Sequence, residues 1–420
     1  MKKATKLASF LIAAAMTLTG CGNNTPAETH ASVETTAPVQ TEEQTTTSVE
    51  PEGPTENTYT PDSTNVKLIG RTLAQDGILW LAQSASGIEF TFKGTKASVD
   101  IKGDGTVSGN ADDQARFAVY VNGERKLDEM VTEAEKSYDI FSSDSSEDVT
   151  VKIIKLSESA NSVFGIKDLV VTSEGGISPT PEKDLKIEFI GDSITCGYGV
   201  DDENRNHHFS TTTEDATKTY AFKTAEKLDA DYSFVSYSGH GIISGYTSNS
   251  KEKNTASLVP PIYEDFAKNY GSAGSYVDVT TDWDFNSFVP DYIVINLGTN
   301  DDSYVKSDNE KKEEFVTEYA EFLKTVRKDN PDAHIVCALG IMGAGLYKSI
   351  EDAAAKYTED TGDTNVSTLL LSTQNGETGY AADWHPTEAT HEIAAEETTD
   401  HIRSVIDGTY TGSGETAEAA

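Results

Sequence analysis

Four short blocks in the second half of the chain carry the side chains that could perform chemistry. In the first block, Ser193 follows the apolar run 187–190, with Gly191 and Asp192 between them. A serine at the carboxyl end of a buried strand lies where α/β proteins build their sites. Its hydroxyl is a weak nucleophile at neutral pH, so it needs a base and donors for the oxyanion.

The other three blocks contain residue types that meet these needs. Ser238-Gly239-His240-Gly241 follows the run 232–237, Gly298-Thr299-Asn300-Asp301 follows the run 292–297, and Asp383-Trp384-His385-Pro386 follows the last predicted strand. Any one block could be an ordinary turn, because glycine, aspartate and serine are common turn residues. Four blocks, each after a predicted strand, predict a hydrolytic serine site.

Each block has a predicted role in attack on a carbonyl. His385 is the predicted general base, which takes the Ser193 proton and returns it to the leaving alcohol. The predicted oxyanion donors are the N–H of Ser193, the N–H of a glycine in the second block and the side-chain amide of Asn300. Spacing from the preceding strand favours Gly241 as that glycine, with Gly239 as the alternative. His240, between them, is a rival candidate for the base.

These blocks, in this order, resemble the SGNH hydrolase superfamily, which is named for its Ser, Gly, Asn and His. The variant GDSITCGYG, SGHGI, NLGTND and DWHP behind an all-β region is similar to carbohydrate esterase family two, over roughly residues 65–407. The resemblance implies removal of acetyl groups from plant polysaccharides such as xylan or glucomannan, without metal or cofactor. Two alternatives stay open: an SGNH esterase acting on cell-wall polymers, lipids or thioesters, and an inactive carbohydrate-binding surface protein.

The position of the acid departs from the superfamily pattern. An acid is usual three residues before the histidine, but that residue here is Ala382, and Asp383 lies two before. Residues two apart in an extended segment point to the same side, so we predict that Asp383 orients His385. A backbone carbonyl is the alternative. With a histidine as base, activity should fall in acid with an apparent pKa of about 6 to 7.

Evidence for a sugar substrate within the residues themselves is limited to aromatic side chains. Trp384 adjoins the base and is the predicted substrate platform, since an aromatic face can stack on a sugar ring. Of the three cysteines, Cys196 and Cys337 are expected to be buried thiols rather than a disulfide. No group of cysteine or histidine residues has a spacing that predicts a metal site.

The elements that must position these blocks form an α/β domain over 185–408. Apolar strands alternate there with helical patterns, which predicts a parallel sheet with helices on both faces. The expected helices are 220–228, 310–328, 346–357 and 389–406. Before the proline-containing segment 178–184, short β-like runs separated by turn residues predict a small β-sandwich, jelly-roll-like, over 64–177. Its expected strands are 88–92, 97–101, 115–121, 149–156 and 164–171.

The N-terminus predicts export and lipidation. Three lysines precede the short apolar run 7–16, and Leu18-Thr19-Gly20-Cys21 resembles a lipobox, so residues 1–21 are the predicted lipoprotein signal and Cys21 the lipidated residue. Residues 22–63, rich in Thr, Glu and Pro, form a predicted disordered linker, and 409–420 a predicted disordered tail. The protein is therefore expected outside the cytoplasm, with this anchor as its only membrane attachment.

The net charge further restricts the partners. The formal charge is −37, because 70 acidic residues face 33 basic ones. Such a charge opposes contact with nucleic acid or an anionic membrane surface. We therefore expect a neutral polysaccharide or oligosaccharide substrate and no nucleic-acid partner.

Overall fold

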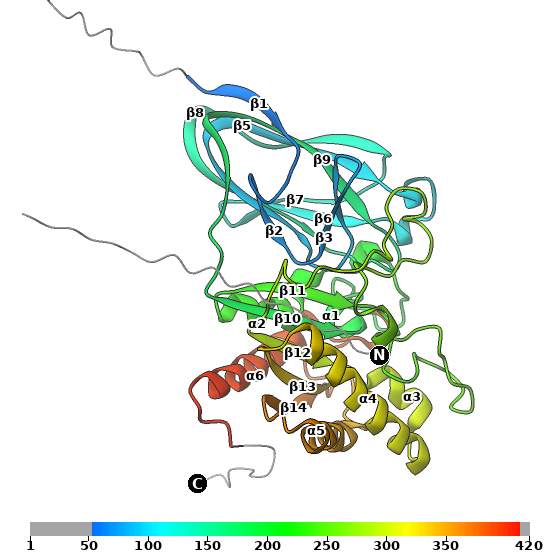
Figure 1. Cartoon of the computed structure of the whole chain (residues 1–420). Helices are drawn as coiled ribbons and strands as arrows, with labels where there is room; N and C mark the ends of the chain where they lie inside the picture. The colour runs from blue at the N-terminus through cyan, green and yellow to red at the C-terminus, as the bar shows by residue number, and fades with distance from the viewer. Residues whose placement is uncertain (1–52, 412–420) are drawn as a thin grey trace, which may run out of the picture. The chain divides into compact units, whose positions relative to one another are not determined.

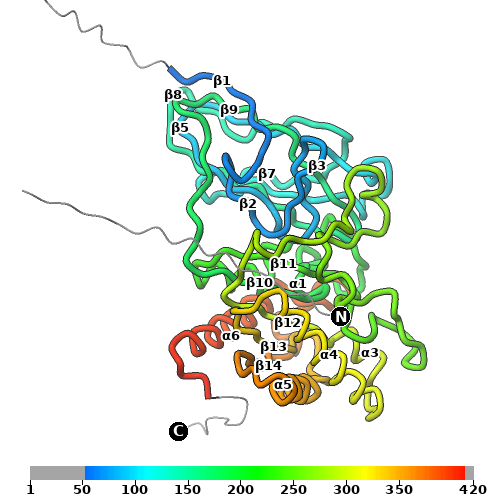
Figure 2. Tube along the Cα trace, in the orientation of Figure 1, coloured from blue at the N-terminus to red at the C-terminus, as the bar shows by residue number. Residues whose placement is uncertain are grey.

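The structure is a computed structural model that describes residues 53–411 (Figures 1 and 2). The predicted signal and Cys21 lie outside this range, as do residues 22–52 of the predicted linker and 412–420 of the predicted tail. In the described part no helix combines the length and apolar character needed to cross a membrane.

A five-stranded parallel sheet forms the centre of the C-terminal half. Its order is β11 (Ala230–Ser236), β10 (Leu185–Gly191), β12 (Tyr292–Asn296), β13 (His334–Ile341) and β14 (Val366–Thr373). All neighbouring strands run parallel, so their carboxyl ends meet at one edge. The first strand, β10, lies inside the sheet between β11 and β12, and the chain leaves it at the candidate nucleophile.

Helices cover both faces of this sheet, which confirms the predicted fold class (Figure 1). α2 (Tyr220–Lys227) and α6 (Glu388–Ile406) pack on one face, and α4 (Asn309–Asp329) and α5 (Tyr347–Thr361) on the other. Alternate residues of each strand point to opposite faces, so both faces of a central strand must be apolar. The short α3 (Thr299–Val305) follows β12 directly.

The N-terminal half is a nine-stranded antiparallel sheet that curves around its own apolar core (Figure 2). Its main path is β3 (Thr72–Gln75), β4 (Ile78–Leu81), β9 (Phe164–Pro179), β5 (Gly87–Gly103), β8 (Glu135–Lys155), β6 (Arg116–Val121) and β7 (Glu124–Met130), while β1 (Thr55–Tyr59) pairs with β9 and β2 (Lys67–Ile69) with β5. We call this half the β-domain.

Two expectations for the β-domain were wrong. The predicted strands 88–92 and 97–101 are one strand, β5, in which Gly94 lies at a register shift rather than in a turn. A Cβ at Gly94 would lie 2.1 Å from the carbonyl oxygen of Thr172, so close strand approach explains the glycine. The predicted linker 22–63 also includes β1, whose side chains are mostly exposed. Backbone pairing with β9 orders this strand, and composition does not report backbone pairing.

The β-domain and the hydrolase half share apolar packing. Ala118 and Ile154 of the β-domain lie in the same buried cluster as Phe189 and Tyr220. A second cluster joins Trp80 to residues of the loop 266–279. Since side chains from both halves fill these clusters, the β-domain is part of the scaffold of the hydrolase half.

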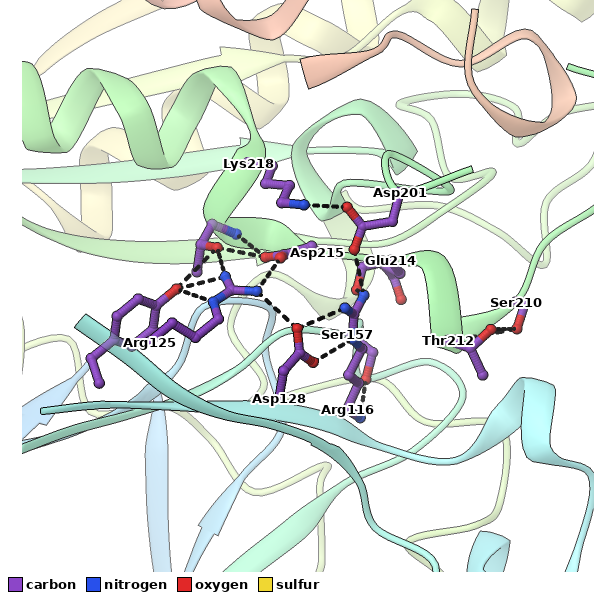
Figure 3. Close-up of polar contacts among 12 residues, drawn as sticks. Arg116, Arg125, Asp128, Ser157, Asp201, Ser210, Thr212, Glu214, Asp215 and Lys218 are labelled. Atoms are coloured by element: carbon purple, nitrogen blue, oxygen red, sulfur yellow. Dashed lines mark hydrogen bonds and ion pairs between the residues drawn. The ribbon is translucent and has the colours of Figure 1, made fainter. Parts of the chain in front are cut away.

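An ion-pair network reinforces this junction (Figure 3). Arg125 Nη1 of the β-domain lies 2.8 Å from Asp215 Oδ2 and 3.0 Å from Asp128 Oδ2. Arg116 Nη1 lies 2.8 Å from Asp201 Oδ2, and Lys218 pairs with the same carboxylate. Asp201 and Asp215 belong to the segment that follows the nucleophile, so these arginines attach that segment to the β-domain.

Candidate active site

The turn after β10 presents Ser193 as the first residue of the single-turn helix α1 (Ser193–Cys196). Asp192 is the N-cap, and its Oδ1 accepts a hydrogen bond of 3.0 Å from the N–H of Ile194. Gly191 is needed for space, because a Cβ there would lie 2.0 Å from Thr195 Oγ1. Burial raises the pKa of Asp192 to about 7, and nearby Asp301 adds to the shift.

His385 lies against the nucleophile. Its Nε2 is 2.9 Å from Ser193 Oγ, and its Nδ1 is 3.1 Å from the carbonyl oxygen of Ala382. A carbonyl can only accept, so Nδ1 carries the proton and the bare Nε2 can take the serine proton. The structure therefore brings together the predicted nucleophile and base, whose residues are 192 positions apart. Proton transfer from Ser193 to His385 needs no rearrangement.

Burial changes the acid–base properties of His385. Loss of solvation lowers its pKa to about 4, although the Ala382 carbonyl and the charge of Asp383 favour the protonated form. The activity is therefore expected to fall near pH 4 rather than at about pH 6 to 7, because the sequence-based value was that of a solvated imidazole. The neutral base should persist well into the acid range.

Asp383 does not occupy the place predicted for it. Its Oδ2 accepts a 2.6 Å hydrogen bond from the Tyr198 hydroxyl, and its Oδ1 is 2.9 Å from His208 Nδ1. Asp383 and Trp384 have φ values of 48° and 65°, so the segment is a left-handed turn and not the extended chain that the prediction assumed. Residues 383 and 385 therefore do not point to the same side, and the Ala382 carbonyl, not Asp383, accepts the hydrogen bond from His385 Nδ1.

Tyr198 connects the acid to the base. Its ring stacks on the His385 imidazole at a centroid separation of 3.9 Å and an interplanar angle of 15°. Burial opposes ionisation of Asp383, but hydrogen bonds from Tyr198 and His208 outweigh it and keep the pKa of Asp383 below its ordinary value. Tyr198 thus limits rotation of the base. Sequence reasoning gave this tyrosine no role in holding the base.

In the second block the backbone hydrogen bonds favour Gly239 rather than Gly241 as the candidate oxyanion donor. The N–H of Gly241 donates to the Ser257 carbonyl at 3.2 Å, so Gly241 is not available as a donor. Among residues 53–411, the N–H of Gly239 has no hydrogen-bond partner, and its φ is 76°. The alternative, Gly239, is therefore the candidate donor. The spacing from the preceding strand favoured Gly241 because it does not show that Gly241 forms an isolated bridge with Leu258.

Asn300 lies between the first and second blocks. Its Nδ2 donates to Asp192 Oδ2 at 3.1 Å and to the His240 carbonyl oxygen at 2.9 Å. The predicted oxyanion role requires this amide to exchange the Asp192 contact for the developing oxyanion. The N–H of Ser193, at the first position of α1, has no partner among the described residues and can also donate.

Sequence reasoning missed Asp301. This buried carboxylate accepts from the N–H groups of Ile242, Ile243 and Ser244, at 3.0, 2.7 and 3.0 Å for Oδ1. Burial raises its pKa to about 6, and these backbone donors oppose the shift. Asp301 thereby fixes the chain immediately after the second block. An acid directly after Asn300 was the only sequence signal for this role.

Exposed aromatic groups lie beside the base. Trp384 is 48% exposed, and its ring centroid is 5.1 Å from that of Tyr380. The Arg205 guanidinium lies 4.1 Å from the centroid of the Trp384 ring. The predicted platform is thus about half exposed to solvent, and the Arg205 guanidinium lies over one face of its ring.

One group among the described residues could geometrically hold a metal ion. It consists of Glu158, Cys196 and Glu214, whose candidate ligand atoms lie within 4.8 Å of one another. The buried Lys155 already supplies a positive charge there, and burial lowers the pKa of Lys155 to about 8 while the nearby carboxylates oppose the shift. Lys155 Nζ donates to the carbonyl oxygens of Ser157 and Glu158, so this group is a buried polar cluster that already contains a basic side chain. Cys196 and Cys337 are both buried and free, as expected.

Comparison with known families gives two matches along the chain. Residues 68–181 match the model described as carbohydrate esterase 2 N-terminal, and residues 189–393 match that of the GDSL-like lipase/acylhydrolase family. The two matches cover the β-domain and the four blocks in the same order. In the order of these two matches the chain resembles carbohydrate esterase family 2.

Similar proteins include the cellulase/esterase CelE of Acetivibrio thermocellus, 32% identical over 77% of this chain. The chain spans 37% of the length of that relative. An acetylxylan esterase/glucomannan deacetylase of Cellvibrio japonicus is 26% identical over 65% of this chain and 72% of its own length. The structure of a family two carbohydrate esterase from Clostridium thermocellum in complex with cellohexaose is 29% identical, with a TM-score of 0.69, and covers 81% of this chain and 99% of that chain.

Proposed function

We propose that this protein is a serine esterase that removes O-acetyl groups from a polysaccharide of the xylan or glucomannan type. The observation that carries the proposal is the 2.9 Å contact between Ser193 Oγ and the unprotonated Nε2 of His385. The activities named for the relative from Cellvibrio japonicus, acetylxylan esterase and glucomannan deacetylase, support the substrate class. The bound cellohexaose in a related structure supports a sugar ligand.

The reaction follows from the geometry. His385 Nε2 takes the proton as Ser193 Oγ attacks the acetyl carbonyl, and the N–H groups of Ser193 and Gly239 and the amide of Asn300 stabilise the oxyanion. As the tetrahedral intermediate collapses, the imidazolium of His385 protonates the sugar oxygen, which leaves as a free hydroxyl, and an acetyl-serine remains. Water activated by the same imidazole releases acetate. Tyr198 and the Ala382 carbonyl hold the imidazole in one orientation through both steps.

The test compares acetate release from acetylated xylan, acetylated glucomannan and O-acetylated peptidoglycan at equal acetyl concentration. We expect the two plant polymers to be preferred, and Ser193→Ala to remove activity on every substrate while far-ultraviolet circular dichroism stays unchanged. Preference for peptidoglycan would favour the cell-wall alternative. Activity of Ser193→Ala within tenfold of wild type would refute the serine mechanism altogether.

The location is part of the same proposal. The lipobox-like Leu18-Thr19-Gly20-Cys21 supports lipidation of Cys21, which would place the enzyme outside the cytoplasm and attach it to the membrane. The predicted linker after Cys21 would separate the described part from the lipid surface. Such a tether would give the site access to a polymer too large to enter the cell.

A further inference from the structure

The peptide that joins Ser238 to Gly239 carries the candidate oxyanion N–H. A peptide unit is planar, and its N–H and C=O point in opposite directions. The group that fixes the carbonyl oxygen of Ser238 therefore also fixes the direction of the Gly239 N–H. Glycine tolerates many φ values, so this peptide would otherwise be able to flip and turn its carbonyl oxygen towards the oxyanion.

His240 holds that carbonyl. Its Nδ1 lies 3.0 Å from the Ser238 oxygen, and because a carbonyl only accepts, Nδ1 must carry the proton. The imidazole is buried, and burial lowers its pKa, so the neutral ring is the stable form. Its Nε2 is 3.5 Å from the Tyr270 hydroxyl. The backbone oxygen of His240 also accepts from Asn300 Nδ2 at 2.9 Å, so one residue contacts two parts of the oxyanion site.

The β-domain holds the other side of Ser238. Glu158, in the segment between β8 and β9, accepts a 2.8 Å hydrogen bond from the N–H of Ser238 through Oε2. The N–H of Glu158 in turn donates to Glu214 Oε2 at 2.9 Å. Because the peptide before Ser238 is fixed in this way, the main remaining freedom is the flip of the peptide after it, and His240 restrains this flip.

These contacts also exclude His240 as the base. Its Nδ1 is directed at the Ser238 carbonyl and its Nε2 at Tyr270, whereas Ser193 Oγ is bonded to His385. His240 therefore has no contact with the nucleophile, and another reason must account for a buried imidazole in this turn.

We propose that His240 is a positioning residue that locks the Ser238–Gly239 peptide with its N–H directed at the oxyanion. This inference rests on the proposed esterase function and adds to it how the oxyanion site is preorganised. A donor aimed at the oxyanion acts in the transition state, so its loss lowers kcat and leaves KM nearly unchanged.

The experiment compares two amide side chains, asparagine and glutamine, which differ in length by one methylene group. The amide nitrogen of His240→Asn falls near the position of Nδ1, while that of His240→Gln falls near Nε2, beyond the carbonyl. His240→Leu removes the donor. The control is His401→Leu, which removes an imidazole bonded to Ser367 near the start of β14. Each variant is assayed on p-nitrophenyl acetate, with active sites counted by a serine-reactive phosphonate and thermal unfolding followed in parallel.

We expect kcat per active site to fall about 10- to 100-fold in His240→Leu and His240→Gln, with KM within about twofold of wild type. His240→Asn should stay within about fivefold, and His401→Leu should keep the wild-type kcat. Equal kcat values for the Asn and Gln variants, or a kcat of His240→Leu within threefold of wild type, would overturn this inference and leave the proposed esterase function standing. A wild-type enzyme inactive on every acetyl ester would overturn the proposed function and this inference together.

Discussion

Replacing Asp383 with asparagine distinguishes a catalytic dyad from a triad. In the structure the imidazole Nδ1 donates to the Ala382 carbonyl, and Asp383 is bonded to Tyr198 and His208 instead. Asparagine can still accept from the Tyr198 hydroxyl through its side-chain oxygen, so the stack of Tyr198 on His385 should survive. The substitution then removes only a charge.

The size of the effect follows from that charge. The carboxylate is bonded to Tyr198 and His208 and makes no side-chain hydrogen bond to the imidazole, so only a charge–charge interaction is lost. For two unit charges roughly 7 Å apart, effective dielectric constants of about 80 and about 20 give about 0.6 and about 2.4 kcal/mol. Because 1.36 kcal/mol corresponds to tenfold in rate, kcat should fall by less than about a hundredfold. A triad acid that sets the tautomer would instead cost up to ~10⁴.

The assay is kcat on p-nitrophenyl acetate at pH 7, for Asp383→Asn beside His385→Ala. We expect His385→Ala to lose on the order of 10⁴ or more, because no other base contacts Ser193 in the structure of residues 53–411. Tyr198→Leu is the matched test of the stack and should cost more than Asp383→Asn. A loss above about 10³ for Asp383→Asn, with an unchanged fold, would refute the dyad.

Three further predictions concern the base, the junction and the anchor. Because burial lowers the pKa of His385 to about 4, kcat/KM for an uncharged acetate ester should stay nearly constant from pH 7 to pH 5 and fall as the imidazole protonates near pH 4. A half-maximal kcat/KM near pH 6.5, with the fold intact by circular dichroism, would show that burial does not lower this pKa. Arg125→Ala leaves the buried Asp215 without its ion-pair partner and should lower the free energy of unfolding by about 2 to 4 kcal/mol in urea titrations. The control Lys126→Ala loses an exposed pair with Glu124 and should lower it by less than about 1 kcal/mol. Equal losses for the two variants would show that this network does not hold the junction. In a bacterium that processes lipoproteins, the protein should fractionate with membranes and Cys21→Ala should not be processed to the lipidated form; identical processing and fractionation of the two would rule out lipidation.

Sequence patterns determined the parts of this protein that depend on local order along the chain. Alternating apolar strands and helices predicted the parallel sheet covered on both faces, and the helix limits around α2, α4 and α6 were within a few residues. A strand that ends in a glycine and a polar turn must place that turn at the sheet edge. For this reason Ser193 and His385 were predictable as partners although 192 positions separate them.

Tertiary structure alone decided which groups meet within that edge. The left-handed turn at Asp383 and Trp384 directs the carboxylate to Tyr198. The sequence prediction assumed an extended segment, in which residues two apart point to the same side, so it did not predict this turn. Likewise the sequence offers both Gly239 and Gly241 as donors and favours Gly241, and only the bond from Gly241 to Ser257 removes Gly241 as a donor. Backbone hydrogen bonds between distant segments have no residue-type signature.

The contribution of the β-domain also required the folded structure. Its strands are recognisable in the sequence, but nothing in the local pattern shows that Glu158 reaches Ser238 or that Arg125 pairs with Asp215. Such contacts join residues that are 80 and 90 positions apart. Their partners are set by how two apolar surfaces pack together, and that packing depends on side-chain shape over the whole junction rather than on the spacing of any motif.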